Sequence, residues 1–357
     1  MNVSKMTTGL IPEWHPQDAV LLAWPDETMD WSYILTEVRA CYTQLITALL
    51  GATDVVLLMR DQRESLPAEL QAMQSGESGK HRLKVVDDFQ LNDTWMRDVM
   101  PLFGATNGQP VAYDFGFNGW GLKFASNLDN SATRRLFRER SLFSKEVRYI
   151  NRLGTILEGG AIDINSRGEL LTTACVLHEE NRNPSYNQQS TAEYFYPDMG
   201  INKVHLLTTA EPLEGDDTDG HIDTLARFAD DDTLLYCSCD NPQAPHYAML
   251  KNMEQELQAL TNIEGKPYRC IPLPLPAPIY DEEGQQLPAT YANFLISNGT
   301  LFLPIYNDPN DSIASEIVRQ ALPQYRVVTI DCRALIQQHG SLHCITMQVP
   351  QGYLLMK

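Results

Sequence analysis

The chain has 357 residues, and 43% of them are hydrophobic, so it can bury a sizeable core in one or two domains. Its net charge of −19 and pI of about 4.7 argue against binding to nucleic acid or to anionic membranes, and they are compatible with a small cationic partner. The seven cysteines are scattered without a C-x-x-C pair, which predicts neither a disulfide framework nor a structural zinc site. Without a signal peptide or a membrane-length apolar run, the sequence predicts a cytoplasmic protein.

Short apolar runs alternate with amphipathic segments along the whole chain, which predicts an α/β fold. Strands are predicted at 19–24, 54–59, 83–86, 111–115, 149–150, 170–174, 204–207, 233–237, 270–275, 301–303, 326–331 and 345–347. Helices are predicted at 31–50, 66–73, 130–143, 190–196, 246–260 and 312–322. Since no linker or low-complexity segment interrupts this pattern, we interpret residues 1–357 as one domain.

Polar residues recur where these structural units end. Asp98, Glu158, His221, Asn293 and Cys344 are separated by 60, 63, 72 and 51 residues. A period of about 60 residues favours a repeated α/β architecture in which each unit delivers one polar residue to a common centre. A plain α/β sheet, whose alternation of helices and strands imitates a repeat, is the alternative.

The stretch from Gly340 to Thr346 carries the candidate nucleophile. Cys344 follows a Gly-Ser pair and His343, and a nucleophilic thiol needs access to a cleft and a lowered pKa. Most cysteines are instead inert core residues, and Cys41, on the apolar face of a predicted helix, is of this kind. Local sequence therefore makes Cys344 the candidate and leaves the inert alternative open.

His221 lies in an unusually acidic segment, with Asp223 two residues away and several aspartates between 216 and 219. If residues 221–225 are extended, the side chains of His221 and Asp223 point the same way. The carboxylates would raise the pKa of the imidazole, which suits a general acid for an amine leaving group. A solvated acidic turn or a loop for a divalent cation is the alternative.

A planar cation is bound best by an aromatic face and by a carboxylate that accepts two parallel hydrogen bonds. Trp95 and Asp98 could supply both, although a core tryptophan beside an Arg97–Asp98 surface pair is the alternative. Glu158 precedes two glycines and is either a further acceptor or a turn residue. Trp120, in a glycine-rich turn, either covers a site or packs over glycine.

Several familiar motifs are missing from the sequence. It contains no P-loop, G-x-G-x-x-G, H-E-x-x-H or G-x-S-x-G. Nucleotide-dependent chemistry, zinc proteolysis and the serine hydrolase fold are therefore not the leading hypotheses.

Four segments in this order resemble the motifs of agmatine deiminases: Asn92–Asp98, Leu157–Gly160, Gly220–Asp223 and Gly340–Cys344. Those enzymes belong with the Porphyromonas-type peptidyl-arginine deiminases in the guanidine-modifying superfamily, and the resemblance runs from about Pro12 to the C-terminus. It implies a five-bladed α/β propeller with pseudo-fivefold symmetry, built from repeated ββαβ-like units.

The resemblance also implies roles for individual residues. Cys344 is expected to attack the guanidinium carbon, Asp98 and Asp223 to hold the guanidinium nitrogens, and His221 to protonate departing ammonia. His221 would then act as base for the water that hydrolyses a covalent thiouronium intermediate. The other residues expected to line the substrate site are Trp95, Glu158, Asp217, Trp120 and Asn293. Neither a metal nor an organic cofactor is implied.

The expected substrate is agmatine, which would give N-carbamoylputrescine and ammonia. The chain lacks a signal peptide and an extra C-terminal domain, which favours agmatine over peptidyl arginine, the alternative substrate. The acidic run 216–219 is a candidate for binding the far ammonium. The segment 117–121 departs from the Asn-Ala-Trp-Gly-Gly form expected of agmatine deiminases, which bears on specificity. The sequence leaves a homo-oligomer open.

Three other classes of function fit the sequence less well. An amidinotransferase would pass the amidino group to an amine acceptor rather than to water. A binding module without activity would not need Cys344, His221, Asp98 and Asp223 together. A thiol protease would not need the paired carboxylates.

Overall fold

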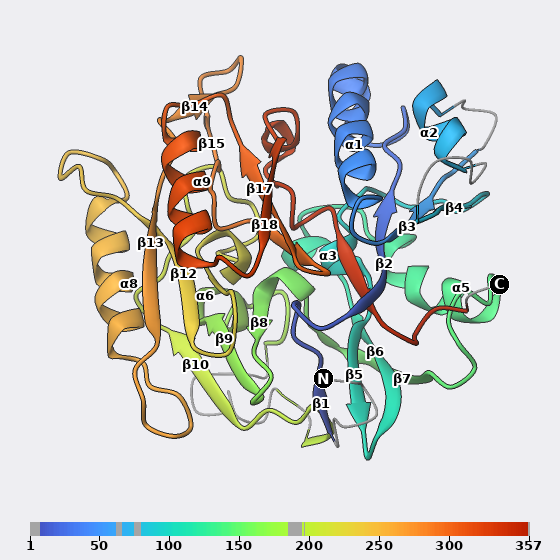
Figure 1. Ribbon diagram of the computed structural model, residues 1–357, viewed down its shortest axis with the longest axis horizontal. Helices are drawn as coiled ribbons and strands as arrows, with labels where there is room; N and C mark the ends of the chain where they lie inside the picture. Colours follow the sequence, from blue (N-terminus) through green and yellow to red (C-terminus); the bar gives the residue numbers. More distant parts are fainter. Residues whose placement is uncertain (1–7, 62–65, 75–79, 185–194, 196, 356–357) are drawn as a thin grey trace.

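The computed structural model describes residues 8–61, 66–74, 80–184, 195 and 197–355. Strands and helices alternate along this part of the chain, which confirms the predicted α/β class (Figure 1). The predicted helix 190–196 lies outside the described residues, apart from residue 195. Within those residues, no helix combines the length and the hydropathy that crossing a bilayer requires.

The strands form separate sheets rather than one. The sheet built from both chain ends has the order β19 (Met347–Pro350), β2 (Gln17–Ala23), β3 (Asp54–Leu58) and β4 (Leu83–Val86). The next contains β1 (Thr8–Leu10), β5 (Leu102–Thr106), β6 (Gln109–Gly116) and β7 (Arg148–Ile156). The third has the order β10 (Lys203–Leu207), β9 (Glu169–Thr173) and β8 (Ile162–Ile164).

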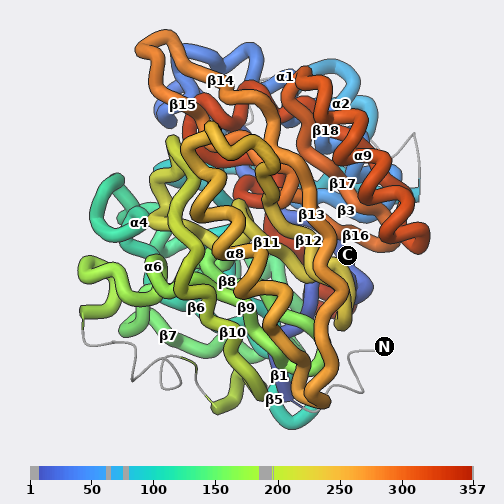
Figure 2. The backbone as a smooth tube through the Cα atoms, turned by 90° about the vertical axis from the view of Figure 1, so that its left-hand side faces the viewer, coloured from blue at the N-terminus to red at the C-terminus, as the bar shows by residue number. Residues whose placement is uncertain are grey.

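Two more three-stranded sheets and a hairpin complete the strands of the described chain. One sheet contains β11 (Ala226–Phe228), β12 (Thr233–Ser238) and β13 (Arg269–Pro274). The other contains β16 (Leu295–Ser297), β17 (Thr300–Ile305) and β18 (Arg326–Asp331). The hairpin pairs β14 (Ile279–Tyr280) with β15 (Gln286–Leu287), and Figure 2 shows it at the top of the molecule, far from β1 and β5.

Helices occupy the connections between parallel strands. The α-helices are α1 (Leu35–Leu49), α2 (Ala68–Gln74), α3 (Met96–Val99), α4 (Gly119–Leu122), α5 (Ala132–Arg138), α6 (Ala174–Leu177), α8 (Tyr247–Ala259) and α9 (Asn310–Ala321). The 3-10 helices are η2 (Ser32–Ile34), η3 (Asp129–Ser131), η4 (Gly159–Ala161), η6 (Pro197–Met199), η7 (Ile222–Thr224) and η8 (Leu335–Gln338). In Figure 1, α1, α8 and α9 lie toward the outside of the molecule.

One pairing pattern recurs in five of these sheets. A first strand pairs antiparallel with a second, and the second pairs parallel with a third across a connection that contains a helix. In the sheet from both chain ends, β19 is the first strand and pairs with β2, so the pattern is completed by joining the C-terminal and N-terminal segments (Figure 1). The observed unit is therefore strand–strand–helix–strand, not one continuous α/β sheet.

The core explains why these segments fold as predicted. In α1, Val38, Tyr42, Leu45 and Leu49 recur at helical spacing and are buried against the sheet that contains β2 and β3. In β2, the five residues 19–23 are all apolar and buried, as expected of a strand covered on both faces. The helix predicted at 130–143 ends at Arg138, because Ser141 adopts a left-handed turn with a φ of 47°.

Candidate active site

Five short segments, each just upstream of the first strand of one unit, carry the predicted polar residues. Asp98 lies in α3 before β5, Glu158 before η4 and β8, His221 before η7 and β11, Asn293 before β16, and Cys344 before β19. α3 contacts η4, and η4 contacts η7. The repeated units therefore bring these residues together from distant parts of the sequence.

Cys344 is buried beside Asn293 and Asp223. The Asn293 side-chain amide donates to Sγ at 3.3 Å, and the thiol lies 3.7 Å from Asp223 Oδ2. Burial, followed by the negative charges of Asp223 and Asp98, raises the pKa of the Cys344 thiol well above its usual value. The sulfur is therefore a thiol at neutral pH in this structure.

Asp98 is fixed by donors on both carboxylate oxygens. Trp120 Nε1 donates to Oδ2 at 2.9 Å, and the backbone N–H of Gly160 donates to Oδ1 at 2.8 Å. His221 Nδ1 is 3.7 Å from Oδ1. Burial raises the pKa of Asp98, with Asp223 acting in the same direction and His221 opposing it. A nearby cation would therefore lower the pKa of Asp98 and stabilise its ionised form.

His221 and Asp223 both carry side-chain atoms that form no hydrogen bond with the described protein. Both ring nitrogens of His221 and Oδ1 of Asp223 are buried without a hydrogen-bond partner among the described residues. Buried polar atoms without a protein partner are rare in folded proteins and mark a candidate binding site. A Cβ on Gly160 would lie 2.5 Å from His221 Nδ1 and 3.1 Å from Asp223 Oδ2, so glycine at this position lets both side chains approach the backbone closely.

The backbone around His221 differs from the prediction. Residues 222–224 form the 3-10 helix η7 and are not extended. Two threonines favour this turn: Thr218 Oγ1 accepts from the N–H of His221 at 3.1 Å, and Thr224 Oγ1 donates to its carbonyl at 2.9 Å. His221 and Asp223 nevertheless both approach Gly160.

Oδ2, the second carboxylate oxygen of Asp223, is bound by a neighbouring histidine. His343 Nδ1 lies 2.7 Å from Asp223 Oδ2. Burial tends to raise the pKa of Asp223, but the hydrogen bond and charge of His343, then His221 and Arg227, hold it below its usual value. Asp223 is therefore ionised, with Oδ1 left for a ligand.

Glu158 is paired with a buried arginine. Arg182 Nε lies 2.9 Å from Glu158 Oε1, its Nη1 lies 2.7 Å from Asp219, and its Nη2 donates to the carbonyl of Thr218 at 2.8 Å. The guanidinium thus ties Glu158 to the turn that precedes His221. Glu158 therefore helps to orient this turn through its ion pair with Arg182.

Most of the acidic run is used within the protein. Asp216 accepts from Thr218 Oγ1 at 2.7 Å and from the N–H of Gly220 at 2.8 Å, which shapes the turn. Asp219 forms an ion pair with Lys123 at 2.6 Å. The described part of the chain contains no group of three or more His, Cys, Asp or Glu side chains arranged to hold a metal ion.

Asp217 differs from its neighbours, because its carboxylate makes no hydrogen bond or ion pair with any described residue. Only its carbonyl is engaged, by Lys123 at 2.6 Å. Burial raises the pKa of Asp217 to about 6, while His339 and Lys123 lower it and Asp216 raises it further. Asp217 is thus a partly exposed carboxylate available to a cation.

The tryptophans support the site in different ways. Trp95 packs against Gly340, where a Cβ would lie 2.2 Å from the indole ring, so it fixes the stretch leading to Cys344. Trp120 has a left-handed backbone with a φ of 52° and packs against Phe117 and Phe124. This strained conformation directs its indole N–H to Asp98.

One alternative for this region is wrong, and the sequence analysis missed two residues that lie next to the site. An Arg97–Asp98 surface pair is wrong, because both side chains are buried and Arg97 Nη2 donates to Gln348 at 2.6 Å. His343 entered the sequence argument only as the neighbour of Cys344, yet it contacts Asp223 directly. Glu13, which contacts His343, gave no local signal because it is a single acidic residue near the N-terminus.

Sequence and structure comparisons relate the chain to known proteins. A sequence profile of the Porphyromonas-type peptidyl-arginine deiminases matches residues 9–350. The chain belongs to this family. Membership confirms the resemblance seen in the four sequence motifs.

Two solved structures and one curated relative cover nearly the whole chain. A C. jejuni agmatine deiminase, solved as a cysteine-to-serine variant with substrate bound, is 34% identical, with a TM-score of 0.85 and 97% of each chain covered. A Porphyromonas gingivalis protein, provisionally described as an arginine deiminase, is 42% identical, with a TM-score of 0.88 and coverage of 97% of this chain and 99% of that one. Agmatine deiminase from Pseudomonas fluorescens is 28% identical, covering 95% of this chain and 94% of that one. The α/β fold is shared with these structures.

Proposed function

We propose that this protein is an agmatine deiminase, which hydrolyses agmatine to N-carbamoylputrescine and ammonia. The observation that carries the proposal is the set of unpartnered atoms on His221 and Asp223 beside Cys344 and Asp98. Carboxylates, an imidazole and a thiol around one small space suit a planar guanidinium cation. The C. jejuni and P. fluorescens relatives named agmatine deiminases support this substrate.

The first half-reaction begins with the two carboxylates. Asp98 and Asp223 accept hydrogen bonds from the guanidinium and turn its carbon toward Cys344 Sγ. The substrate's positive charge offsets the carboxylates that raise the thiol pKa, so the thiol gives its proton to His221 and becomes a thiolate. Sulfur adds to the guanidinium carbon, and the carbon–nitrogen bond breaks as His221 gives a proton to the leaving ammonia. A thiouronium on Cys344 results.

In the second half-reaction, water replaces ammonia. Having given up its proton, His221 takes one from this water as the oxygen attacks the thiouronium carbon. The tetrahedral adduct then expels the Cys344 thiolate and releases N-carbamoylputrescine. The sum is agmatine plus water giving the ureido product plus ammonia, and no redox partner is needed.

Asp217 is our candidate for the far ammonium of agmatine. Its carboxylate makes no described hydrogen bond, and it is close enough to His221 for that residue to lower its pKa. Agmatine has no carboxylate, so one anionic group suffices for its distal end. A peptidyl arginine has no free ammonium at this position, which is why Asp217 favours agmatine over the alternative substrate.

We also infer that residues 1–357 form one domain, a five-bladed α/β propeller with pseudo-fivefold symmetry. Three observations support the inference. Five sheets of the described chain repeat one pairing pattern, β19 and β2 join the two chain ends, and each unit supplies one segment to the site. In a ring of repeated units, the same end of every unit faces the central axis, so each unit contributes one segment to a shared site.

Product analysis by mass spectrometry tests the proposed function. The purified protein receives agmatine, free arginine and a blocked peptidyl arginine in parallel, with Cys344→Ala as the matched control. We expect replacement of an imino group by oxygen on agmatine alone, and no product from the variant. Conversion of only the peptide would make the protein a peptidyl-arginine deiminase, and conversion of none would refute the deiminase assignment.

A further inference from the structure

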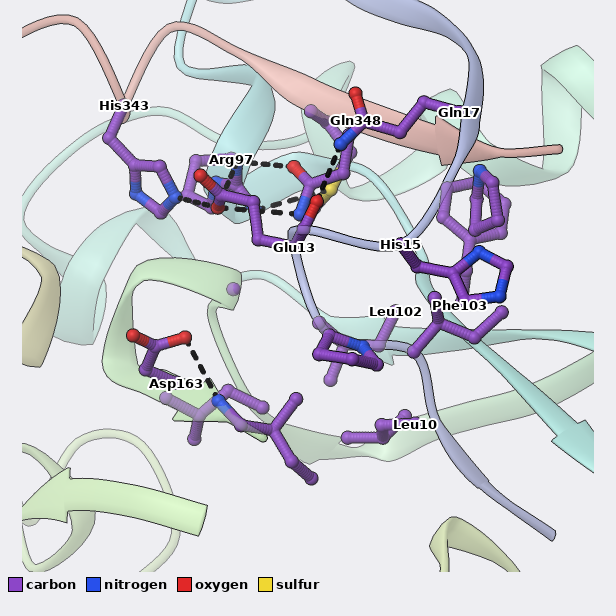
Figure 3. A pocket seen from close by; sticks show the side chains of 17 residues that line it. Leu10, Glu13, His15, Gln17, Arg97, Leu102, Phe103, Asp163, His343 and Gln348 are labelled. Carbon is purple, nitrogen blue, oxygen red and sulfur yellow. Dashed lines mark hydrogen bonds and ion pairs between the residues drawn. The ribbon is translucent and has the colours of Figure 1, made fainter. Parts of the chain in front are cut away.

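His343 sits in a buried ion cluster behind the catalytic cysteine. Its ring is 2% exposed, with Nδ1 2.7 Å from Asp223 Oδ2 and Nε2 2.7 Å from Glu13 Oε2. Figure 3 shows the ring directed at Glu13, which lies between His343 and Gln348. The imidazole therefore bridges two carboxylates that lie 210 residues apart in the sequence, one near the N-terminus and one in the middle of the chain.

Both contacts require a donor on the ring. An ionised carboxylate only accepts hydrogen bonds, whereas neutral imidazole has one N–H and one acceptor nitrogen. Two nitrogens that each donate to a carboxylate belong to an imidazolium. A neutral ring would be possible only if Glu13 or Asp223 carried a proton.

Glu13 is surrounded by donors and is ionised. Arg227 Nη2 lies 2.8 Å from its Oε2, the N–H of Ile296 lies 2.5 Å from its Oε1, and Arg97 Nη2 lies 3.7 Å from Oε2. Burial tends to raise the pKa of Glu13, but Arg227, His343 and Arg97 hold it far below its usual range. A proton between Glu13 and His343 therefore stays on the His343 ring.

Charge balance points the same way. The charged groups that face His343 from the neighbouring elements are Glu13, Asp163, Asp223, Arg97 and Arg227. Asp163 accepts from Arg227 Nε at 2.9 Å and from the N–H of Phe228 at 2.8 Å, and these donors oppose the rise that burial causes in the pKa of Asp163. The carboxylates of Glu13 and Asp223, which contact the two ring nitrogens directly, stabilise a positive charge on His343.

We propose that His343 donates from both ring nitrogens, as an imidazolium, and acts as the positioning residue for Asp223. The cation keeps Asp223 ionised and engages Oδ2, which leaves Oδ1 directed at the guanidinium. This role rests on the proposed deiminase function, in which Asp223 holds the substrate. His343 itself does not touch the substrate.

The charge of the ring is measured directly by NMR. Nitrogen chemical shifts of a protein with ¹⁵N-labelled histidines separate imidazolium from both neutral tautomers, and backbone connection to Cys344 assigns His343. We expect both His343 nitrogens to carry a proton at the pH of the activity assay. His205, whose pKa burial lowers to about 4, is the neutral reference in the same spectrum. A neutral His343 ring at the pH of the activity assay would overturn the proposal.

The kinetic test uses His343→Gln, with His205→Gln as the matched buried control. A glutamine side chain cannot carry a charge, so in His343→Gln the pKa of Asp223 rises. Both histidine variants are made in an Asp217→Asn background, so that the titration of Asp217 does not mask that of Asp223, and we expect the remaining acid limb of kcat/KM for agmatine to move up by about one pH unit in His343→Gln. At a fixed pH on this limb, that shift lowers kcat/KM about tenfold. His205→Gln leaves the limb in place, because His205 bonds Tyr268 and no site residue.

The outcomes separate the possible roles. A uniform loss of activity without movement of the acid limb would make His343 merely structural and refute the proposal. If the wild-type protein does not turn over agmatine at all, the proposed function fails, but the NMR spectrum still decides the charge of His343. If His343→Gln does not fold, the wild-type spectrum decides alone.

Discussion

Replacing Gly160 by alanine tests whether the space between the catalytic side chains is the substrate site. The new Cβ would lie 2.5 Å from His221 Nδ1, 2.9 Å from Asp98 Oδ1 and 3.1 Å from Asp223 Oδ2. At the first two distances the neighbouring atoms must move. None of the three is a flexible surface side chain, because all are buried.

The magnitude follows from this displacement. A shift of about 1 Å in a catalytic group costs about 100-fold in rate, so we expect kcat/KM for agmatine to fall about 100-fold. Overpacking of this kind costs about 1–3 kcal/mol in the free energy of unfolding, a small enough loss for many folded domains to survive. We therefore expect Gly160→Ala to stay folded while it loses most of its kcat/KM for agmatine.

The assay compares Gly160→Ala with Gly154→Ala by steady-state kinetics and urea unfolding. Gly154 lies in β7, and a Cβ there meets no atom within 4 Å, so its replacement should leave kcat/KM unchanged. Wild-type kcat/KM in folded Gly160→Ala protein would refute the claim that the substrate occupies this space. Equal losses in both variants would show a general effect of alanine in place of glycine.

Two further predictions concern the acidic turn. Because the pKa of Asp217 is raised to about 6, its carboxylate becomes neutral as the pH falls through that value, and KM for agmatine should rise below about pH 6. Asp217→Asn should raise KM throughout and remove this dependence, and a variant that keeps the wild-type KM profile would exclude Asp217 as the ammonium site. Arg182→Met leaves Glu158 buried without its cation, so urea unfolding should show a loss of about 3–5 kcal/mol, whereas wild-type stability would show that the pair contributes little.

The local signals in the sequence predicted the elements well where apolar periodicity is strong. The helix expected at 246–260 is α8 (Tyr247–Ala259), and the strand expected at 326–331 is β18 with the same bounds. The strand expected at 345–347 lies at Met347–Pro350, because Thr346 Oγ1 bonds the carbonyl of His343 and closes a turn first. Side-chain to backbone bonds of this kind leave little trace in hydrophobic periodicity.

The candidate site was predictable as a set of residues but not as a network. Motif resemblance and spacing identified Cys344, His221, Asp98 and Asp223. Nothing local in the sequence indicates that Glu13 contacts the residue next to the nucleophile, since that contact depends on β19 pairing with β2 across the chain ends. Long-range pairing of this kind is a property of the fold and not of a segment.

Intact-protein mass spectrometry of acid-quenched turnover mixtures tests the central claim most directly. The account predicts that protein mixed with agmatine gains the mass of agmatine less ammonia, that peptide mapping places the adduct on Cys344, and that Cys344→Ala gains nothing. Product formation by Cys344→Ala, or an adduct on any other residue of an active protein, would contradict the proposed covalent mechanism.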